Sequence, residues 1–156
     1  MKFIEVRGED TEIINGILDL EKINFGANGG VDIWTLKPLV RYGKVFVLMD
    51  EDIVVSAIEF IHKFESREMY LYGVSTRKEF WGRGCAKELI KRSTEYFKEK
   101  GIEKISLTVA PENKRAVGLY KKIGYTLENI QKSEYGEGVD RLYMVKKLSE
   151  NTKEIV

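Results

Sequence analysis

The stretch FWGRGCAKEL (Phe80–Leu89) places two glycines one residue apart, directly before a segment with helical periodicity. Apolar residues then recur at three- and four-residue spacing up to Phe97, and Gly101 supplies a C-terminal cap. The first N–H groups of a helix have no partner within it, and the helix dipole adds partial positive charge there. Arg83 and Lys87 add local positive charge. The turn therefore suits a phosphate group, and a plain turn that starts a helix is the alternative.

Two common nucleotide-binding patterns do not fit this turn. A P-loop has Gly-Lys followed by Ser or Thr, and neither Gly82 nor Gly84 precedes a lysine. The dinucleotide fingerprint has a third glycine three residues after the second, where this chain has Lys87. The turn by itself therefore does not identify its ligand.

The rest of the chain predicts one α/β (α+β) domain over residues 1–148, with a short tail at 149–156. Periodicity and turn residues predict strands at 2–7, 44–50, 53–64, 68–76, 104–109, 125–135 and 140–148. They predict helices from Asp10 or Thr11 through Glu21, at 34–41, from about 85 to Gly101, and at 113–123. This order indicates a mixed, mostly antiparallel central sheet of about seven strands flanked by helices, with one obvious strand-helix-strand crossover.

Composition excludes several classes of function. The 156 residues are 43% apolar and 33% charged, as in globular proteins, and the formal net charge is only +1. No global field attracts nucleic acid or an anionic membrane. One cysteine and one histidine argue against a disulfide and against a metal site, so we expect no metal. No signal-peptide pattern and no apolar run of about 20 residues is present, so we expect a cytoplasmic protein without membrane contact.

Two segments together resemble a known family. Residues 81–86, WGRGCA, are similar to the acetyl-CoA pyrophosphate loop of the GNAT N-acetyltransferase superfamily, whose pattern is Arg/Gln-x-x-Gly-x-Gly/Ala. Val109–Tyr125, VAPENKRAVGLYKKIGY, resembles the family's downstream block. Two motifs in this order, about thirty residues apart with a helix and a strand between them, are far more specific than either one. One departure stands out, because Trp81 occupies the usual Arg or Gln position.

The resemblance spans roughly residues 2 to 148 and implies the acyl-CoA N-acyltransferase (GNAT) fold. It implies direct transfer of an acetyl group from acetyl-CoA, as cosubstrate, to a primary amine of a small molecule, peptide or protein. The central strand's backbone would pair with the pantetheine arm. The implied cofactor-binding residues are Gly73, Val74, Thr76, Trp81, Gly82, Arg83, Gly84, Cys85, Ala86, Lys87, Asn113 and Tyr120.

Acetyl transfer to an amine needs a base and benefits from an acid. A lysine-like amine with a pKa near 10.4 is neutral only on the order of one part in a thousand at pH 7. The resemblance assigns Tyr120 as the acid for the leaving thiolate. It assigns Glu68 as the base, because this glutamate lies six residues before Val74, as in the histone-acetyltransferase branch. Tyr72 with a water, or Glu59, is the alternative base.

Other interpretations of the same residues stay open. Tyr120 also fits a core tyrosine, and Asn113 a helix N-cap. Glu68 also fits a solvated strand start, and Glu59 the polar face of a strand. Cys85 fits either a packed side chain or an acyl carrier with a lowered pKa. A catalytically inactive CoA-binding module of the same fold and a plain interaction domain are the alternative functions.

The acceptor is identified least well by the sequence. The segment Glu21–Arg41 and the hairpin YGEGVDR are expected to line its pocket, and their acids would suit a cationic amine. These acids are Glu21, Asp32, Glu137 and Asp140. Dimers are common in the family, so a homodimer is left open.

Overall fold

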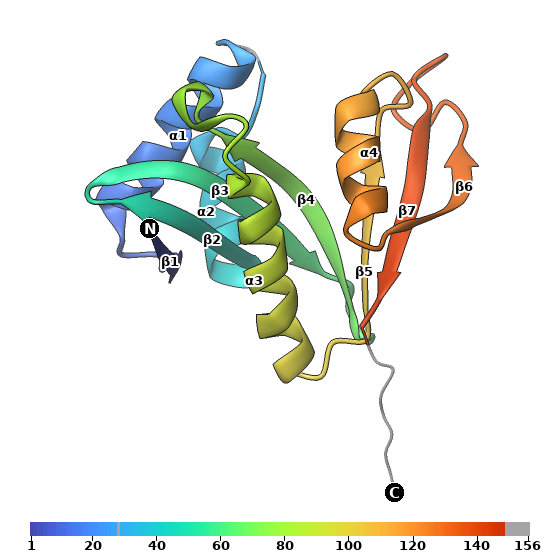
Figure 1. Ribbon diagram of the computed structural model, residues 1–156, viewed down its shortest axis with the longest axis horizontal. Helices are drawn as coiled ribbons and strands as arrows, with labels where there is room; N and C mark the ends of the chain where they lie inside the picture. Colours follow the sequence, from blue (N-terminus) through green and yellow to red (C-terminus); the bar gives the residue numbers. More distant parts are fainter. Residues whose placement is uncertain (28, 149–156) are drawn as a thin grey trace, which may run out of the picture. The chain divides into compact units, whose positions relative to one another are not determined.

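A computed structural model describes residues 1–27 and 29–148, and within them the chain forms seven strands and four α-helices (Figure 1). The tail predicted for 149–156 lies outside the described residues. The strands are β1 (Lys2–Glu5), β2 (Lys44–Asp50), β3 (Ile53–His62), β4 (Glu68–Thr76), β5 (Lys104–Val109), β6 (Thr126–Gln131) and β7 (Arg141–Lys147). The helices are α1 (Thr11–Phe25), α2 (Ile33–Tyr42), α3 (Cys85–Glu99) and α4 (Lys114–Lys122), with a short 3₁₀ helix, η1 (Lys78–Phe80), before α3. None of these helices is long and apolar enough to cross a membrane.

The seven strands form one mixed sheet in the order β1-β2-β3-β4-β5-β7-β6. Only β4 and β5 are parallel, and α3 provides the crossover between them. This confirms the predicted fold class and element order. Four predicted strands end earlier than expected. β1 stops at Glu5, and β7 stops at Lys147. β3 stops at His62, and β6 stops at Gln131, since the chain then turns with a left-handed backbone at Ser133 (φ 51°) and Gly136 (φ 126°).

The described chain divides into two compact units. The first contains Met1–Ile61 and Tyr72–Glu95, and the second contains His62–Leu71 and the described residues 96–148. The boundaries fall inside β4 and α3. The expectation of a single domain over 1–148 stays a prediction, and each unit is described by itself below.

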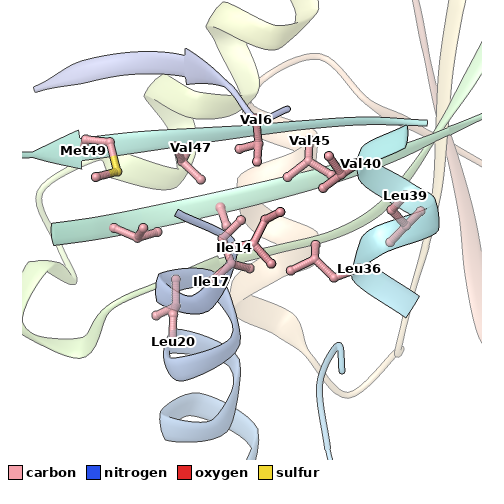
Figure 2. Packing of buried hydrophobic residues seen from close by; sticks show 12 residues of the cluster. Val6, Ile14, Ile17, Leu20, Leu36, Leu39, Val40, Val45, Val47 and Met49 are labelled. Atoms are coloured by element: carbon pink, nitrogen blue, oxygen red, sulfur yellow. The ribbon is translucent and has the colours of Figure 1, made fainter. Parts of the chain in front are cut away.

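In the first unit, α1 and α2 cover one face of β2 and β3. Figure 2 shows apolar side chains of both helices pointing toward the alternate residues Val45, Val47 and Met49 of β2. Phe46 points to the other face, where its ring stacks on Phe3 at 5.0 Å between centroids. The guanidinium of Arg92 in α3 lies 4.9 Å from the centroid of that Phe3 ring. Helices therefore cover both faces, and β3 is buried almost throughout.

In the second unit, β5 lies between the start of β4 and β7. Asn113 caps α4 by accepting a hydrogen bond from the Ala116 N–H at 3.2 Å, which confirms the predicted cap. Gly124 ends the helix with φ 104°, a conformation that favours glycine. The Tyr120 ring of α4 meets the Tyr125 ring edge to face at 5.6 Å. The downstream motif is thus a short capped helix with its tyrosine buried.

Candidate active site

The glycine turn has a backbone that suits an anion. Gly82 and Gly84 have φ of 79° and 76°, and a Cβ at either position would meet open space. α3 begins at Cys85, and its first helical hydrogen bond runs from Glu88 N–H to the Gly84 carbonyl. The amides of residues 85–87 therefore have no partner within the helix. Such donors beside two exposed glycines fit a pyrophosphate group.

The side chains of this loop divide into exposed cations and a packed thiol. Arg83 and Lys87 are exposed, and the Arg83 guanidinium lies 4.9 Å from the Phe80 ring centroid. The Cys85 thiol is buried and lies 3.9 Å from the Phe80 carbonyl oxygen. This burial favours packing over an acyl-carrier role for Cys85.

Trp81, which departs from the family pattern, connects the loop to the end of β4 by a hydrogen bond. Its indole Nε1–H donates to the Thr76 carbonyl at 2.8 Å. The Asn24 side chain of α1 donates to the same carbonyl at 2.9 Å. The resemblance implies that Thr76 pairs with pantetheine, yet its carbonyl already accepts two protein donors. Gly73 and Val74, the other two β4 residues of that prediction, are partly exposed.

We expect Trp81→Phe to loosen this loop without unfolding the protein. The change keeps an aromatic ring but removes the N–H, and one neutral hydrogen bond contributes about 0.5–1.5 kcal/mol. Urea unfolding should show a loss of stability of that order. Trp34→Phe is the matched control, because Trp34 is 85% exposed whereas Trp81 is 49% exposed. Equal stability of the two variants would argue against the proposed connection.

Glu68 lies in a network of donors in the second unit. Its carboxylate accepts hydrogen bonds from the Ser106 hydroxyl at 2.7 Å and the Tyr143 hydroxyl at 3.4 Å. Lys104 Nζ lies 3.3 Å and Lys63 Nζ 3.9 Å from its Oε1. The side chain is only 12% exposed, so the interpretation of a solvated strand start is wrong.

These contacts set the ionisation of Glu68. Burial by itself raises the pKa of this carboxyl, but the hydrogen bonds from Ser106 and Lys104 and the two lysine charges lower the pKa overall. A carboxylate held ionised in this way accepts a proton weakly. The base role of Glu68 therefore stays a prediction that its surroundings do not favour.

Tyr120 is buried, and burial raises its pKa to about 12. The charge of Arg141 partly opposes this rise, and Tyr70 adds to it. The phenol is thus protonated near neutral pH and can donate a hydrogen bond. Both the core interpretation and the functional one are compatible with this placement.

Arg141 is a candidate site residue that the sequence alone did not indicate. Its Nε donates to Thr108 Oγ1 at 3.2 Å and its Nη2 to the Thr108 carbonyl at 3.0 Å. Tyr70 O–H and Thr108 Oγ1 lie 3.1 Å apart. These bonds fix a positive charge whose field acts on the Tyr120 phenol. No local pattern marks Arg141, because its partner lies on the neighbouring strand β5.

Glu59 does not lie on the polar face of its strand, so that simpler interpretation is wrong. Its side chain is fully buried, and neither carboxylate oxygen has a hydrogen-bond partner among the described residues. Burial, and then the charge of Glu21, raise the pKa of Glu59 well above its usual 4.5. Helices on both faces of the sheet bury residues 54–60 of β3, so Glu59 does not lie on a polar face.

Glu21 lies in the same unit and is also buried, at 4% exposure. The Ser75 hydroxyl lies 3.5 Å from its Oε1 and donates to it. Burial raises the pKa of Glu21, while hydrogen bonds from the Val31 N–H and from Ser75 oppose the rise. Glu21 and Glu59 are therefore two buried acids that repel each other.

The other acids predicted near the acceptor have local structural partners. Asp32 caps α2 by accepting a hydrogen bond from the Thr35 N–H at 2.9 Å. Asp140 accepts one from the Ser133 N–H at 2.9 Å and pairs with Lys132 at 3.5 Å, contacts that lower its pKa. Glu137 is exposed. Asp32 and Asp140 thus stabilise a helix start and a turn.

Comparison with curated proteins finds relatives among N-acetyltransferases. The chain is 34% identical over 65 residues to an uncharacterized N-acetyltransferase, YdgE, of Bacillus subtilis, which is 42% of this chain and 41% of that protein. It is 34% identical over 61 residues to the thialysine N-epsilon-acetyltransferase of Bos taurus, 39% of this chain and 36% of that protein. The matched segments thus span less than half the length of these relatives.

Comparison with solved structures supports the fold. The structure of an aminoglycoside 6'-N-acetyltransferase complexed with coenzyme A matches with a TM-score of 0.84. The match covers 98% of this chain and all of that chain at 13% sequence identity. Such low identity shows a shared fold and no more. The pattern of the acetyltransferase (GNAT) family matches residues 24–125, well over half of the sequence, and the chain therefore belongs to this family.

Proposed function

We propose that this protein is an N-acetyltransferase that transfers the acetyl group of acetyl-CoA to a primary amine of a small molecule, peptide or protein. The main support is the loop before α3, where Gly82 and Gly84 adopt left-handed φ values and a Cβ built at either position would meet open space. Family membership supports acetyl transfer in general. The cytoplasmic location and the homodimer stay predictions.

The loop would bind the pyrophosphate through its backbone. The amides of residues 85–87 provide donors that the helix does not use. Arg83 and Lys87 are exposed and add positive charge to a protein whose net charge is close to zero. Trp81 would keep the loop in place through Thr76. At the position where the family has Arg or Gln, Trp81 would thus stabilise the loop by a hydrogen bond within the protein.

Bound acetyl-CoA supplies an activated thioester. The amine first loses a proton, its nitrogen lone pair forms a bond to the acetyl carbon, and the carbon–sulfur bond breaks. The amide nitrogen loses its second proton, and the thiolate gains one, so the products are the amide, the CoA thiol and one proton. The protein's tasks are to remove the first proton and to stabilise the thiolate.

Tyr120 would stabilise the thiolate as a hydrogen-bond donor. Its pKa of about 12 lies roughly 3.5 units above that of a thiol, taken as about 8.5. Complete proton transfer from the phenol would therefore be uphill by roughly 5 kcal/mol. A hydrogen bond to the developing negative charge needs no such transfer. We accordingly assign Tyr120 this role rather than that of a strong acid.

The experiment is ligand-dependent thermal unfolding with a matched pair of glycine variants. Acetyl-CoA at a hundredfold excess over its Kd should stabilise the protein by about 2.7 kcal/mol, whereas ATP and NAD should not. Gly84→Ala should remove most of this stabilisation. Gly138→Ala is the control, because Gly138 has the same φ of 76° and the same open surroundings in the turn between β6 and β7.

The outcomes separate the competing functions. No stabilisation by acetyl-CoA would contradict the proposal and favour a plain interaction domain. Stabilisation without thiol release for any amine in a panel of polyamines, aminoglycosides, amino acids and peptide N-termini would favour an inactive CoA-binding module. If both glycine variants lost the stabilisation equally, the loss would reflect a general effect on folding and not a contact between the loop and acetyl-CoA.

A further inference from the structure

We propose that Glu21 and Glu59 form the binding site for the ammonium group of the acceptor, and that Glu59 receives the proton that the amine gives up. The acceptor is then a primary amine that arrives as a cation. This inference rests on the proposed acetyl transfer and adds its substrate class. All the residues that carry it belong to the first unit.

The first observation is the unused bonding capacity of Glu59. Both carboxylate oxygens are buried and have no hydrogen-bond partner among residues 1–27 and 29–148. A buried polar atom without a partner costs about 1–3 kcal/mol, and more when it is charged. An ammonium group has three N–H donors and carries the opposite charge. A bound ammonium would therefore provide hydrogen bonds to the buried oxygens and balance their negative charge.

The second observation is the absence of a counter-charge in this part of the described chain. Neither Glu21 nor Glu59 forms a salt bridge with a described lysine, arginine or histidine. The one charge shown to act on Glu59 is that of Glu21. Glu21 itself faces the Val31 N–H and the Ser75 hydroxyl, both neutral donors. The pair lacks one positive charge, which a cationic substrate would supply.

The third observation is that glycines lie beside both acids. A Cβ on Gly73 would lie 3.1 Å from Glu59 Oε1, and Gly73 is partly exposed. A Cβ on Gly30 would lie 2.7 Å from Glu21 Oε2, and Gly30 is exposed. At both positions a glycine that is itself partly or fully exposed lies beside a buried carboxylate. A side chain at either position would crowd the acid.

These surroundings also suit the proton transfer. Burial and the charge of Glu21 raise the pKa of Glu59, and a cation bound beside it would favour its ionised, proton-accepting form. A carboxylate that ionises reluctantly is a stronger proton acceptor than an ordinary one. Glu68, the predicted base, differs because two lysines and two hydroxyl groups already neutralise and solvate it.

The test compares two small amines of similar size, ethylamine and 2,2,2-trifluoroethylamine. The first is a cation at pH 7 and must lose a proton, whereas the fluorinated amine is largely neutral. Glu59→Gln should lower kcat/KM for ethylamine by about 10²-fold, the usual contribution of a general base, and lower it for the fluorinated amine by only a few fold. Glu21→Gln should raise the KM for ethylamine. Glu12→Gln, an exposed acid on the same helix, is the control.

A binding measurement keeps the test independent of turnover. Carbon-13 NMR of labelled glutamate carboxyls should show the Glu59 resonance moving when ethylammonium is added, and no movement in Glu59→Gln. An unchanged resonance, or equal losses of kcat/KM for both amines, would overturn the proposal. The stabilisation by acetyl-CoA should survive in both variants. Its absence in the wild-type protein would instead contradict the proposed function.

Discussion

Tyr120→Phe is expected to lower kcat by about 10²–10³-fold and to leave the affinity for acetyl-CoA nearly unchanged. Removing one preorganised donor to a developing negative charge costs this much in other enzymes. The phenol is protonated throughout the working pH range, because burial raises its pKa to about 12, so the donor is always present there. Steady-state rates of thiol release and thermal unfolding with acetyl-CoA measure the two quantities separately.

Tyr125→Phe is the matched control for this prediction. Tyr125 is buried against Tyr120, and its hydroxyl has no hydrogen-bond partner among the described residues. Removing that hydroxyl should leave kcat unchanged and should not destabilise the fold, since an unsatisfied buried hydroxyl is itself unfavourable. If Tyr120→Phe retained kcat within about threefold, or if both variants lost it equally, the donor role would be excluded.

The free energy of unfolding should fall as pH rises from about 4.5 toward the folded-state pKa of Glu59. Burial and then Glu21 raise this pKa, so the folded state binds more protons than the unfolded state in this window. Stability therefore decreases as pH rises, by up to about 1.4 kcal/mol per pH unit for one proton. Glu59→Gln should flatten this slope and be the more stable protein at pH 8.

Glu68 should change the stability in the opposite direction, and at lower pH. Because its pKa is lowered overall, its contribution to stability is present above about 4.5 and is lost as pH falls through its folded-state pKa. Urea unfolding between pH 3 and pH 8.5 should thus show a maximum near the usual carboxyl pKa. Glu68→Gln should weaken the loss of stability at acid pH, to which Asp140 also contributes, and should leave the loss at alkaline pH unchanged. A slope above pH 5 that persists unchanged in Glu59→Gln would contradict the assignment.

Local sequence signals predicted most of the fold. Helical and strand periods, the Asn113 cap and the Gly101 and Gly124 stops depend on residues close in the chain, and all of the predicted elements are present. The errors lie at ends, as in β6, where a turn of left-handed residues replaces the predicted strand. Turn conformation depends on contacts that alternation does not encode.

The features of the site also differ in whether local sequence or tertiary contacts determine them. The sequence by itself determined the element order, the family and the glycine loop before α3, because these depend on neighbouring residues and on two motifs with fixed spacing. Only the tertiary structure decided the roles of Trp81, Glu59 and Glu68. Trp81 bonds to a carbonyl that Asn24 also reaches from far along the chain, and Glu68 meets its Ser106 partner across parallel strands. Glu59 is buried because helices cover both faces of its strand, and burial by elements far away in the sequence leaves no local pattern.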